Sequence, residues 1–156
     1  MLVGVFVLMA TASGGASPTP GALTQLAGTD GCVTNQFNVG TCIVGKALDG
    51  AEAVAVSPDG KHVYVASTQS DAVAVFSRDK ATGVLTQLAG TDGCVSETGT
   101  GGNCAGGKAL DGADAVAVSP DGKHVYVASN TSDAVAVFSR DKATGVLTQL
   151  AGTDGC

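Results

Sequence analysis

Residues 54–67 read VAVSPDGKHVYVAS, and residues 116–129 read VAVSPDGKHVYVAS again. Apolar residues on both sides of a Pro-Asp-Gly-Lys turn predict a β-hairpin. The two copies are 62 residues apart, as are Cys32 and Cys94 (94 − 32 = 62). A fixed period of this size indicates a repeat architecture, in which each unit buries its apolar faces by stacking on its copies.

Each repeat is predicted to form four strands. In the first full copy these are residues 51–57, 62–67, 71–77 and 84–89. Alanine and valine alternate in the first and third strands, so both faces of the sheet are apolar, one with slim and one with bulkier side chains. Such sheets suit close packing around an axis. We therefore predict an all-β fold, a β-propeller with four-stranded antiparallel blades, comprising two complete blades plus a leading outer strand at residues 22–27.

The hairpin sequence, in both copies, resembles the YVTN-type repeat, which also occurs in the lactonase-like seven-bladed β-propellers. The resemblance covers both full repeats. It implies a propeller fold and, as an activity, lactone hydrolysis around a central channel. The motif consists of strand and turn residues, so it carries over no catalytic residue.

The chain divides into segments around these repeats. Residues 1–12 are apolar but too short to span a bilayer. With Ala10 and Ala12 in an A-x-A arrangement they fit a signal peptide, although a basic n-region is missing, and an apolar strand or an upstream start remains an alternative. The further segments are a linker at 13–20, an outer strand and Cys loop of a preceding blade at 21–50, blade 1 at 51–92, a second Cys loop at 93–112, and blade 2 at 113–154.

The cysteines predict one disulfide in each Cys loop. Cys32 and Cys42 are ten residues apart, as are Cys94 and Cys104 (42 − 32 = 104 − 94 = 10), while Cys156 has no partner at this spacing. A metal site would need closer spacing and more ligands, so we expect no metal and no cofactor. Disulfides indicate an extracytoplasmic protein, whether secreted, periplasmic or at the cell surface.

Charge and composition exclude several function classes. The formal net charge of −6 opposes binding to nucleic acid, and the eight lysines and arginines recur at equivalent turns rather than forming a basic patch. We expect no stable membrane span. The sequence contains no G-x-S-x-G, Walker or dinucleotide-binding motif.

One end of the blades is predicted to bind a ligand. In a four-stranded meander alternate connections share an end, which places the Cys loops beside the turns at 68–71 and 130–133. The differences between the two repeats fall almost wholly on this end, which is where binding residues commonly lie on a rigid scaffold; loop drift under weak constraint is the alternative. The candidate residues are Asn35, Gln36, Phe37, Asn38, Glu52, Thr68, Gln69, Asp71, Glu97, Thr98, Asp114, Asn130, Thr131 and Asp133.

Histidine and the remaining aspartates are weaker candidates. His62 and His124 follow the hairpin turn, where we expect solvated edge residues rather than catalytic ones. Side chains in turn contexts are expected to bond their own backbone, at Asp59, Asp79, Asp121 and Asp141. The same bonding is favoured over calcium binding for the aspartates that flank the Cys loops, which are Asp30, Asp49, Asp92 and Asp111, because no contiguous Asp-x-Asp loop is present.

Two functions from different classes follow. The first is a binding scaffold that holds an unknown protein, glycan or surface ligand on its Cys-loop face. The second is a lactone hydrolase, implied by the resemblance, so enzymatic activity is left open. Two blades are too few to close a propeller of about four to eight. We expect either a fragment of a longer propeller or a subunit that self-assembles to complete the ring.

Overall fold

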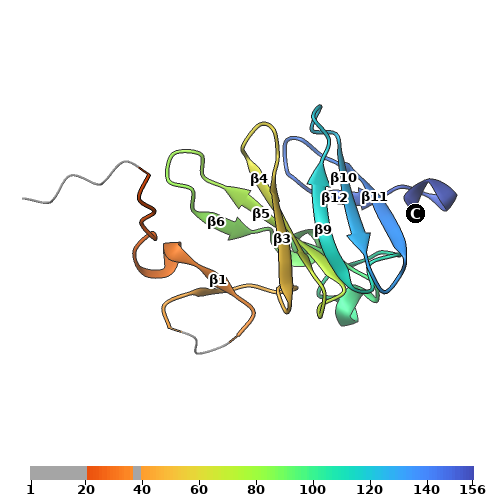
Figure 1. Cartoon of the computed structure of the whole chain (residues 1–156), viewed down its shortest axis with the longest axis horizontal. Coiled ribbons are helices and arrows are strands. Elements are labelled where there is room, and N and C mark those ends of the chain that lie inside the picture. The colour runs from red at the N-terminus through yellow and green to blue at the C-terminus, as the bar shows by residue number, and fades with distance from the viewer. Residues whose placement is uncertain (1–20, 37–39) are drawn as a thin grey trace, which may run out of the picture.

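The computed structural model describes residues 21–36 and 40–156, and its core is a pair of stacked β-sheets (Figure 1). Blade 1 consists of β3 (Ala51–Val56), β4 (His62–Ser67), β5 (Ala72–Arg78) and β6 (Leu85–Gln87), and blade 2 of β9 (Ala113–Val118), β10 (His124–Ser129), β11 (Ala134–Arg140) and β12 (Leu147–Gln149). In each blade every strand pairs antiparallel with the next in the chain. The prediction of an all-β propeller architecture with two complete blades is confirmed.

The Cys loops add short strands to this arrangement. They contain β1 (Val33–Thr34), β2 (Ile43–Val44), β7 (Cys94–Ser96) and β8 (Ala105–Gly106). The 3₁₀ turns η1 (Gly28–Gly31), η2 (Gly90–Gly93) and η4 (Gly152–Gly155) each directly precede a cysteine, and η3 (Gly99–Gly102) lies within the second Cys loop. The β1–β2 and β7–β8 pairs are parallel. β7 also pairs with the first half of β5, while β6 pairs with its second half. The second Cys loop is thus docked on the outer edge of blade 1.

The leading outer strand predicted at residues 22–27 is not formed in the structure. The equivalent segments form β6 and β12 because each has a third strand, β5 or β11, to pair with. Segment 22–27 has no such strand before it in the described part of the chain, and Leu23 is fully exposed. An outer strand of this repeat therefore depends on its neighbour rather than on its own sequence.

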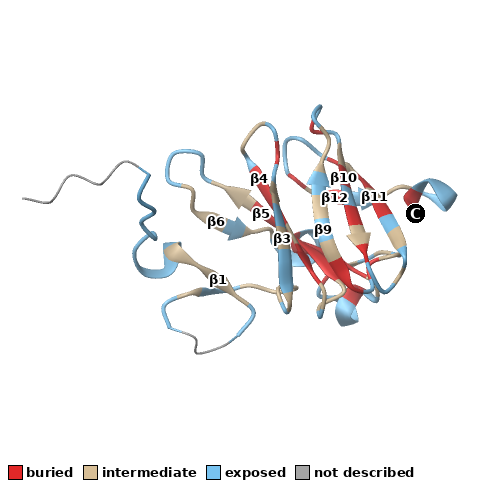
Figure 2. Ribbon diagram, viewed as in Figure 1, coloured by how far each residue is buried: buried red, intermediate tan, exposed pale blue. Residues whose placement is uncertain are grey.

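The core lies between the two blades, as the buried strands in Figure 2 show. Its members come from the facing sides of both sheets and from the second Cys loop, and the fully buried ones include Tyr64, Val73, Val75, Leu110, Val125, Val127 and Phe138. A smaller cluster of Val63, Ala74 and Phe76 lies on the other face of blade 1, beneath Val33 and Leu48 of the first Cys loop. Both faces of blade 1 are thus partly covered, as the alternation of alanine and valine predicts.

A buried arginine joins the blades at the end opposite the Cys loops. Arg140, at the end of β11, donates from Nε to the Tyr64 hydroxyl (2.7 Å), from Nη1 to the Gly122 carbonyl (2.8 Å) and from Nη2 to Asp59 (3.1 Å). Its Nη2 also lies 2.7 Å from His62 Nδ1. Arginine is always protonated, so Nδ1 of His62 accepts. Burial raises the pKa of Tyr64 to about 12.

The expectation that His62 is a solvated edge residue is wrong. Its side chain is buried, against the backbone of Gly145, where a Cβ would lie 2.3 Å from the imidazole Cδ2. Burial, together with the Arg140 charge, lowers the pKa of His62, so the ring is neutral. The partners that bury it come from the next blade, about a repeat away in sequence. His124 has no such cover in the described residues and is half-exposed.

The turn aspartates bond their own backbones. Asp59 accepts from the Lys61 amide (3.1 Å) and the Ser57 hydroxyl (2.6 Å), and Asp121 accepts from the equivalent Lys123 and Ser119 groups. Asp79 and Asp141 accept from amides two and three residues on. Partial burial disfavours the Asp59 anion, but the bonds from Ser57, Lys61 and Arg140 outweigh it and hold its pKa well below the usual range.

Candidate functional site

The Cys loops lie at the end of the blades that the meander predicts. The Glu97 amide donates to the Asp71 carbonyl (3.0 Å), and the Ser70 amide donates to the Asp49 carbonyl (3.1 Å). Asp49 returns a bond from its own amide to the Ser70 hydroxyl (3.0 Å). Both Cys loops therefore contact the turn between β4 and β5.

Both predicted disulfides are present. Cys32 is bonded to Cys42 and Cys94 to Cys104, with Cα–Cα distances of 4.8 and 4.9 Å. Each bridge closes a ten-residue loop beside a short parallel strand pair. Cys156 is a free, exposed thiol. The bridges restrict the conformations of the loops on the candidate binding face.

A cleft of about 580 Å³ lies between the two Cys loops and the β4–β5 turn. Its volume is within the range typical of small-molecule sites. Its side chains are mostly polar and include Asn35, Lys46, Asp49, Gln69, Ser70, Asp71, Thr98, Thr100 and Asn103. The cleft thus presents amides, hydroxyls and carboxylates on one concave surface.

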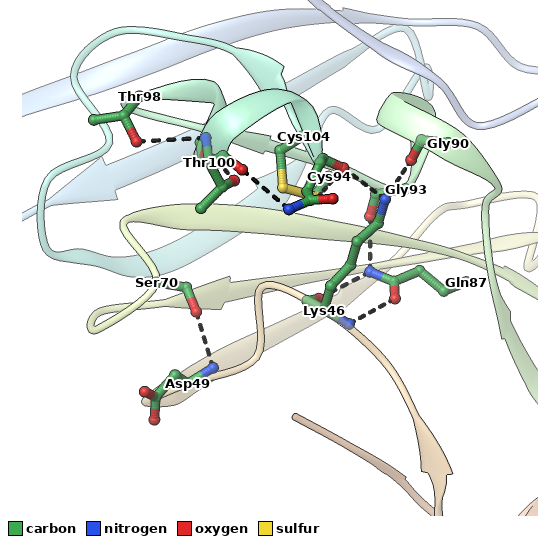
Figure 3. Close-up of a disulfide and its surroundings, with 12 residues drawn as sticks. Lys46, Asp49, Ser70, Gln87, Gly90, Gly93, Cys94, Thr98, Thr100 and Cys104 are labelled. Carbon is green, nitrogen blue, oxygen red and sulfur yellow. Dashed lines mark hydrogen bonds between the residues drawn. A yellow bond between two sulfur atoms is a disulfide. The ribbon is translucent and has the colours of Figure 1, made fainter. Parts of the chain in front are cut away.

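Lys46 and Gln87 hold the first wall of the cleft in place (Figure 3). Gln87 accepts from the Lys46 amide and donates to the Lys46 and Gly93 carbonyls, all at 2.9 Å. The Lys46 ammonium donates to the Gly90 carbonyl and to the Asn103 carbonyl (2.6 Å). The next residue, Ala47, has a φ of 59°, a left-handed conformation that a residue other than glycine adopts only when its surroundings impose it.

The second wall is bonded internally. The Thr98 hydroxyl accepts from the Thr100 amide (3.4 Å), and the Thr100 hydroxyl lies 3.0 Å from that of Ser96. Asn103 donates from its side chain to the Thr100 carbonyl (3.1 Å). With the Cys94–Cys104 bridge, these bonds fix the wall before any ligand arrives.

Four of the residues nominated from the sequence, Asn35, Gln69, Asp71 and Thr98, line the cleft. Others make bonds at the same end: Thr68 donates to the Gly50 carbonyl (3.2 Å), and Glu97 accepts from the Leu110 amide (2.6 Å). The exposed residues Gln36, Asn130, Thr131 and Asp133 lie outside the cleft. Phe37 and Asn38 fall outside the described residues.

Glu52 and Asp114 occupy equivalent irregularities in the innermost strands. In β3 the register shifts between Ala51 and Ala53, and in β9 the shift falls at the same point of the repeat, which leaves Glu52 and Asp114 as bulged residues. Glu52 is exposed beside a shallow hollow of about 200 Å³. Bulges re-aim side chains and are common beside active sites.

Comparison of the two repeats misses several cleft residues for a physical reason. The sequence candidates are positions where the two repeats differ. Lys46, Asp49 and Ser70 do not differ, because the equivalent residues of the second repeat are Lys108, Asp111 and Ser132. The identical residues face a cleft in the first copy because a following Cys loop closes it. The repeated Gly-Lys-Ala-Leu-Asp-Gly sequence after each Cys pair is the signal that marks this wall.

The carboxylates of this face that the structure describes are not grouped as a metal ion would require. Asp71 accepts a hydrogen bond from the Gly112 amide (2.9 Å). The pKa of Asp111 is raised, first by burial and then by the negative charges of the neighbouring Asp71 and Glu97. Within residues 21–36 and 40–156, no group of three or more histidine, cysteine, aspartate or glutamate side chains is arranged to hold a metal ion. None of the helical segments described is long and apolar enough to cross a membrane.

Residues 50–98 and 97–154 each match the family model described as lactonase, 7-bladed beta-propeller. The chain belongs to this family. A periplasmic gluconolactonase from Pseudomonas aeruginosa has a TM-score of 0.53 at 24% identity, over 72% of this chain and 28% of that chain. A candidate 6-phosphogluconolactonase from Bacteroides uniformis has a TM-score of 0.52 at 25% identity, over 71% of this chain and 28% of that chain. The lactonase-family chain therefore spans little more than a quarter of the length of these proteins. The comparison with curated proteins found no match.

Proposed function

We propose that this chain is the ligand-binding part of an extracytoplasmic propeller, and that the cleft between its Cys loops binds a polyhydroxylated ligand such as a glycan. The observation that carries the proposal is the cleft itself, a concavity of about 580 Å³ that is lined mostly by polar residues and lies between two disulfide-closed loops. Walls that are fixed beforehand reduce the entropic cost of binding.

The chemistry of the cleft favours a neutral ligand with many hydroxyl groups. Asn35 and Gln69 each supply donors and acceptors, and the exposed Asp49 carboxylate accepts from hydroxyl groups. The Lys46 ammonium is already bonded to two carbonyl oxygens, so it offers little to an anion. The formal net charge of −6 further disfavours anionic ligands.

An extracytoplasmic location rests on the two disulfides, which persist in oxidising compartments. The similarity to a periplasmic gluconolactonase supports the same location. The proposed signal peptide at residues 1–12 lies outside the described residues.

Titration of the oxidised, isotope-labelled chain with neutral oligosaccharides tests the proposal. We expect chemical-shift changes confined to the cleft, and an affinity loss of about tenfold, worth about 1.4 kcal/mol, in Gln69→Ala and Asp49→Ala. Thr131→Ala is the matched control, because Thr131 is the repeat-equivalent of Gln69 and lies outside the cleft. Shifts that spread over the molecule, or equal losses in all three variants, contradict the proposal.

Lactone hydrolysis is the second candidate, favoured by the family and by the bulged carboxylates Glu52 and Asp114. We propose that these side chains, one per innermost strand, take the proton of a water molecule that attacks the lactone carbonyl carbon. A carboxylate positioned in this way contributes by general base catalysis.

The test is the hydrolysis rate of glucono-1,5-lactone above its spontaneous rate. We expect Glu52→Gln and Asp114→Asn to lower that rate at least tenfold, whereas Asp79→Asn on an exposed turn leaves it unchanged. Hydrolysis that survives both changes, or that is absent in the unmodified chain, rejects this second function without affecting the first.

A further inference from the structure

Blade 2 exposes apolar side chains whose counterparts in blade 1 are buried. Tyr126 and Val135 are 38% and 49% exposed on the side of blade 2 that faces away from blade 1. The repeat-equivalent residues, Tyr64 and Val73, are 0% exposed in the core between the blades. The outer side of blade 2 therefore has the composition of an interface that blade 1 already uses.

Blade 1 shows the converse on its own outer side. Val54 and Val56 are 67% and 52% exposed, whereas their equivalents Val116 and Val118 pack against the inter-blade core. Every large apolar residue that the two blades expose thus has a repeat-equivalent in the interface between them. The two outer sides are the two halves of one interface, and twisted blades stack in this way around an axis.

The polar groups of the interface are repeated as well. Asp121, His124 and Tyr126 are equivalent to the three residues of blade 1 that Arg140 bonds, yet the described chain presents no arginine to them. Arg78, the equivalent of Arg140, donates from Nη1 to the Gly60 carbonyl (3.1 Å) just as Arg140 donates to that of Gly122. The Arg78 guanidinium is therefore held in the same place on its own blade, with the acceptors of a preceding blade missing.

Two smaller features match in the same way. Gly145 leaves room for the His62 ring, while a Cβ at its equivalent, Gly83, would have no other atom within 4 Å. The Asp71 carboxylate accepts from the Gly112 amide. The equivalent of Asp71 is Asp133, beside blade 2, and the equivalent of Gly112 is Gly50, beside blade 1, so the same bond can form between two copies.

We propose that the outer side of blade 2 binds the outer side of blade 1 of a second copy of this chain, head to tail. The partner's Arg78 then bonds Asp121, His124 and Tyr126, and its Val54 and Val56 pack into the same interface, as Val116 and Val118 do between the two blades. A heterologous contact of this kind closes into a ring when the rotation allows. The propellers of the family have seven blades and each copy adds two, so three or four copies form a ring of six or eight, the even numbers nearest to seven.

The leading segment does not prevent this contact. In the second copy, residues 21–31 correspond to positions that β12 and η4 of the first copy already fill. Those residues form no strand pairing in the structure, and Leu23 is fully exposed. They move aside without loss of sheet hydrogen bonds.

The experiment uses the oxidised full chain and two variants, each of which removes one half of the interface. Arg78→Glu alters the outer side of blade 1, and Val135→Glu alters that of blade 2. When the two variants are mixed, one pair of sides stays intact. The unchanged blade 1 of the Val135→Glu chain, with its Arg78, can bind the unchanged blade 2 of the Arg78→Glu chain, with its Asp121. In the remaining pair of sides, the glutamate of Arg78→Glu faces Asp121 and the glutamate of Val135→Glu would have to be buried without a partner, so growth stops at a 1:1 heterodimer.

Light scattering gives the mass of each sample, and circular dichroism shows that each variant is folded. We expect a trimer or tetramer for the unmodified chain, monomers for the single variants and a heterodimer for the mixture. Thr86→Glu, on the exposed rim strand β6, keeps the mass of the unmodified chain. The proposal is overturned if the unmodified chain is monomeric, if Arg78→Glu or Val135→Glu keeps the full mass, or if the mixture stays monomeric.

Discussion

Arg140 is the residue on which the contact between the blades depends most. Its side chain is fully buried and bonds four groups: the Tyr64 hydroxyl, His62 Nδ1, the Gly122 carbonyl and Asp59. Removal of one member of a buried, bonded ion pair leaves the others desolvated and unpaired. The cost of substitution is therefore larger than that of the lost packing alone.

We predict that Arg140→Met lowers the free energy of unfolding by about 3 kcal/mol, the lower end of the range for a broken buried ion pair, because Asp59 keeps partial contact with solvent. Urea unfolding of the Val135→Glu chain, which is expected to be monomeric, isolates this effect from assembly. Lys80→Ala, on an exposed turn, is the control and changes stability by less than about 0.5 kcal/mol. Equal losses in both variants contradict this role of Arg140.

The buried imidazole predicts a dependence of stability on pH. Because burial and Arg140 lower the pKa of His62 in the folded chain, the unfolded chain binds a proton first as the pH falls. Stability is complete above the unfolded pKa of about 6.5 and declines as the pH falls through it towards the folded value.

We expect the urea midpoint of the Val135→Glu chain to fall between pH 7 and pH 5, and His62→Gln to flatten that fall. His124→Gln, at the half-exposed equivalent position, retains it. A fall of the same size in the His62→Gln chain assigns the pH dependence to other groups.

The turn aspartates were predictable from the sequence and the buried histidine was not. Asp59 and Asp121 each bond the amide and the hydroxyl of residues two positions away, so the Ser-Pro-Asp-Gly-Lys sequence contains these local partners. His62 is buried by Arg140 and Gly145, which belong to another blade. Local patterns do not encode such distant partners.

At the scale of elements, one glutamine per repeat joins the outer strand to the Cys loop. Gln87 makes three bonds, two to the backbone of Lys46 and one to the Gly93 carbonyl. Gln149 makes the equivalent three bonds to Lys108 and Gly155. Gln25, the third equivalent, is exposed and, among the residues that the structure describes, bonds only the Gly31 carbonyl (3.0 Å).

We predict that Gln87→Ala destabilises the folded chain by about 2 kcal/mol, since it leaves partly buried backbone groups of the cleft wall unpaired. Hydrogen exchange of the Lys46 amide accelerates in this variant. Gln25→Ala is the matched control and leaves stability within about 0.5 kcal/mol. Unchanged exchange at Lys46 shows that the wall is held in another way.

The two disulfides are predicted to differ in their effect on stability. Each closes a ten-residue loop, for which the chain-entropy model gives about 3 kcal/mol. Cys94 and Cys104 are also buried, whereas Cys32 and Cys42 are half-exposed. The Cys94→Ala/Cys104→Ala variant therefore loses more stability than Cys32→Ala/Cys42→Ala in thermal unfolding. The reverse order contradicts the burial argument.

The strands of each blade and the pairing of the cysteines followed from period, alternation and spacing. The leading strand did not, because residues 22–27 have the sequence of β6 without a strand to pair with. The cleft was predicted only in part, because equality between repeats concealed Lys46 and Asp49. A repeat sequence thus specifies its unit well, while the environment of each copy depends on its place in the array.

At the scale of the whole molecule, assembly couples stability to concentration. Association that involves the folded chain alone raises the unfolding temperature as the protein concentration rises. We predict this rise for the unmodified chain and its absence for Arg78→Glu, measured by calorimetry over a hundredfold range. A concentration-independent unfolding temperature in both means that the folded chain does not associate.

The arginine that crosses between blades has a consequence for how such a gene changes length. The contact between the blades takes Asp, His and Tyr from one unit and Arg and Gly from the following one, and both units carry all five residues at equivalent positions. Unequal recombination that inserts or deletes one whole unit in frame therefore creates no mismatched junction. A third unit spliced after residue 144 is expected to dock on blade 2 with no further substitution, so the number of blades is free to vary while the sequence of the unit stays fixed.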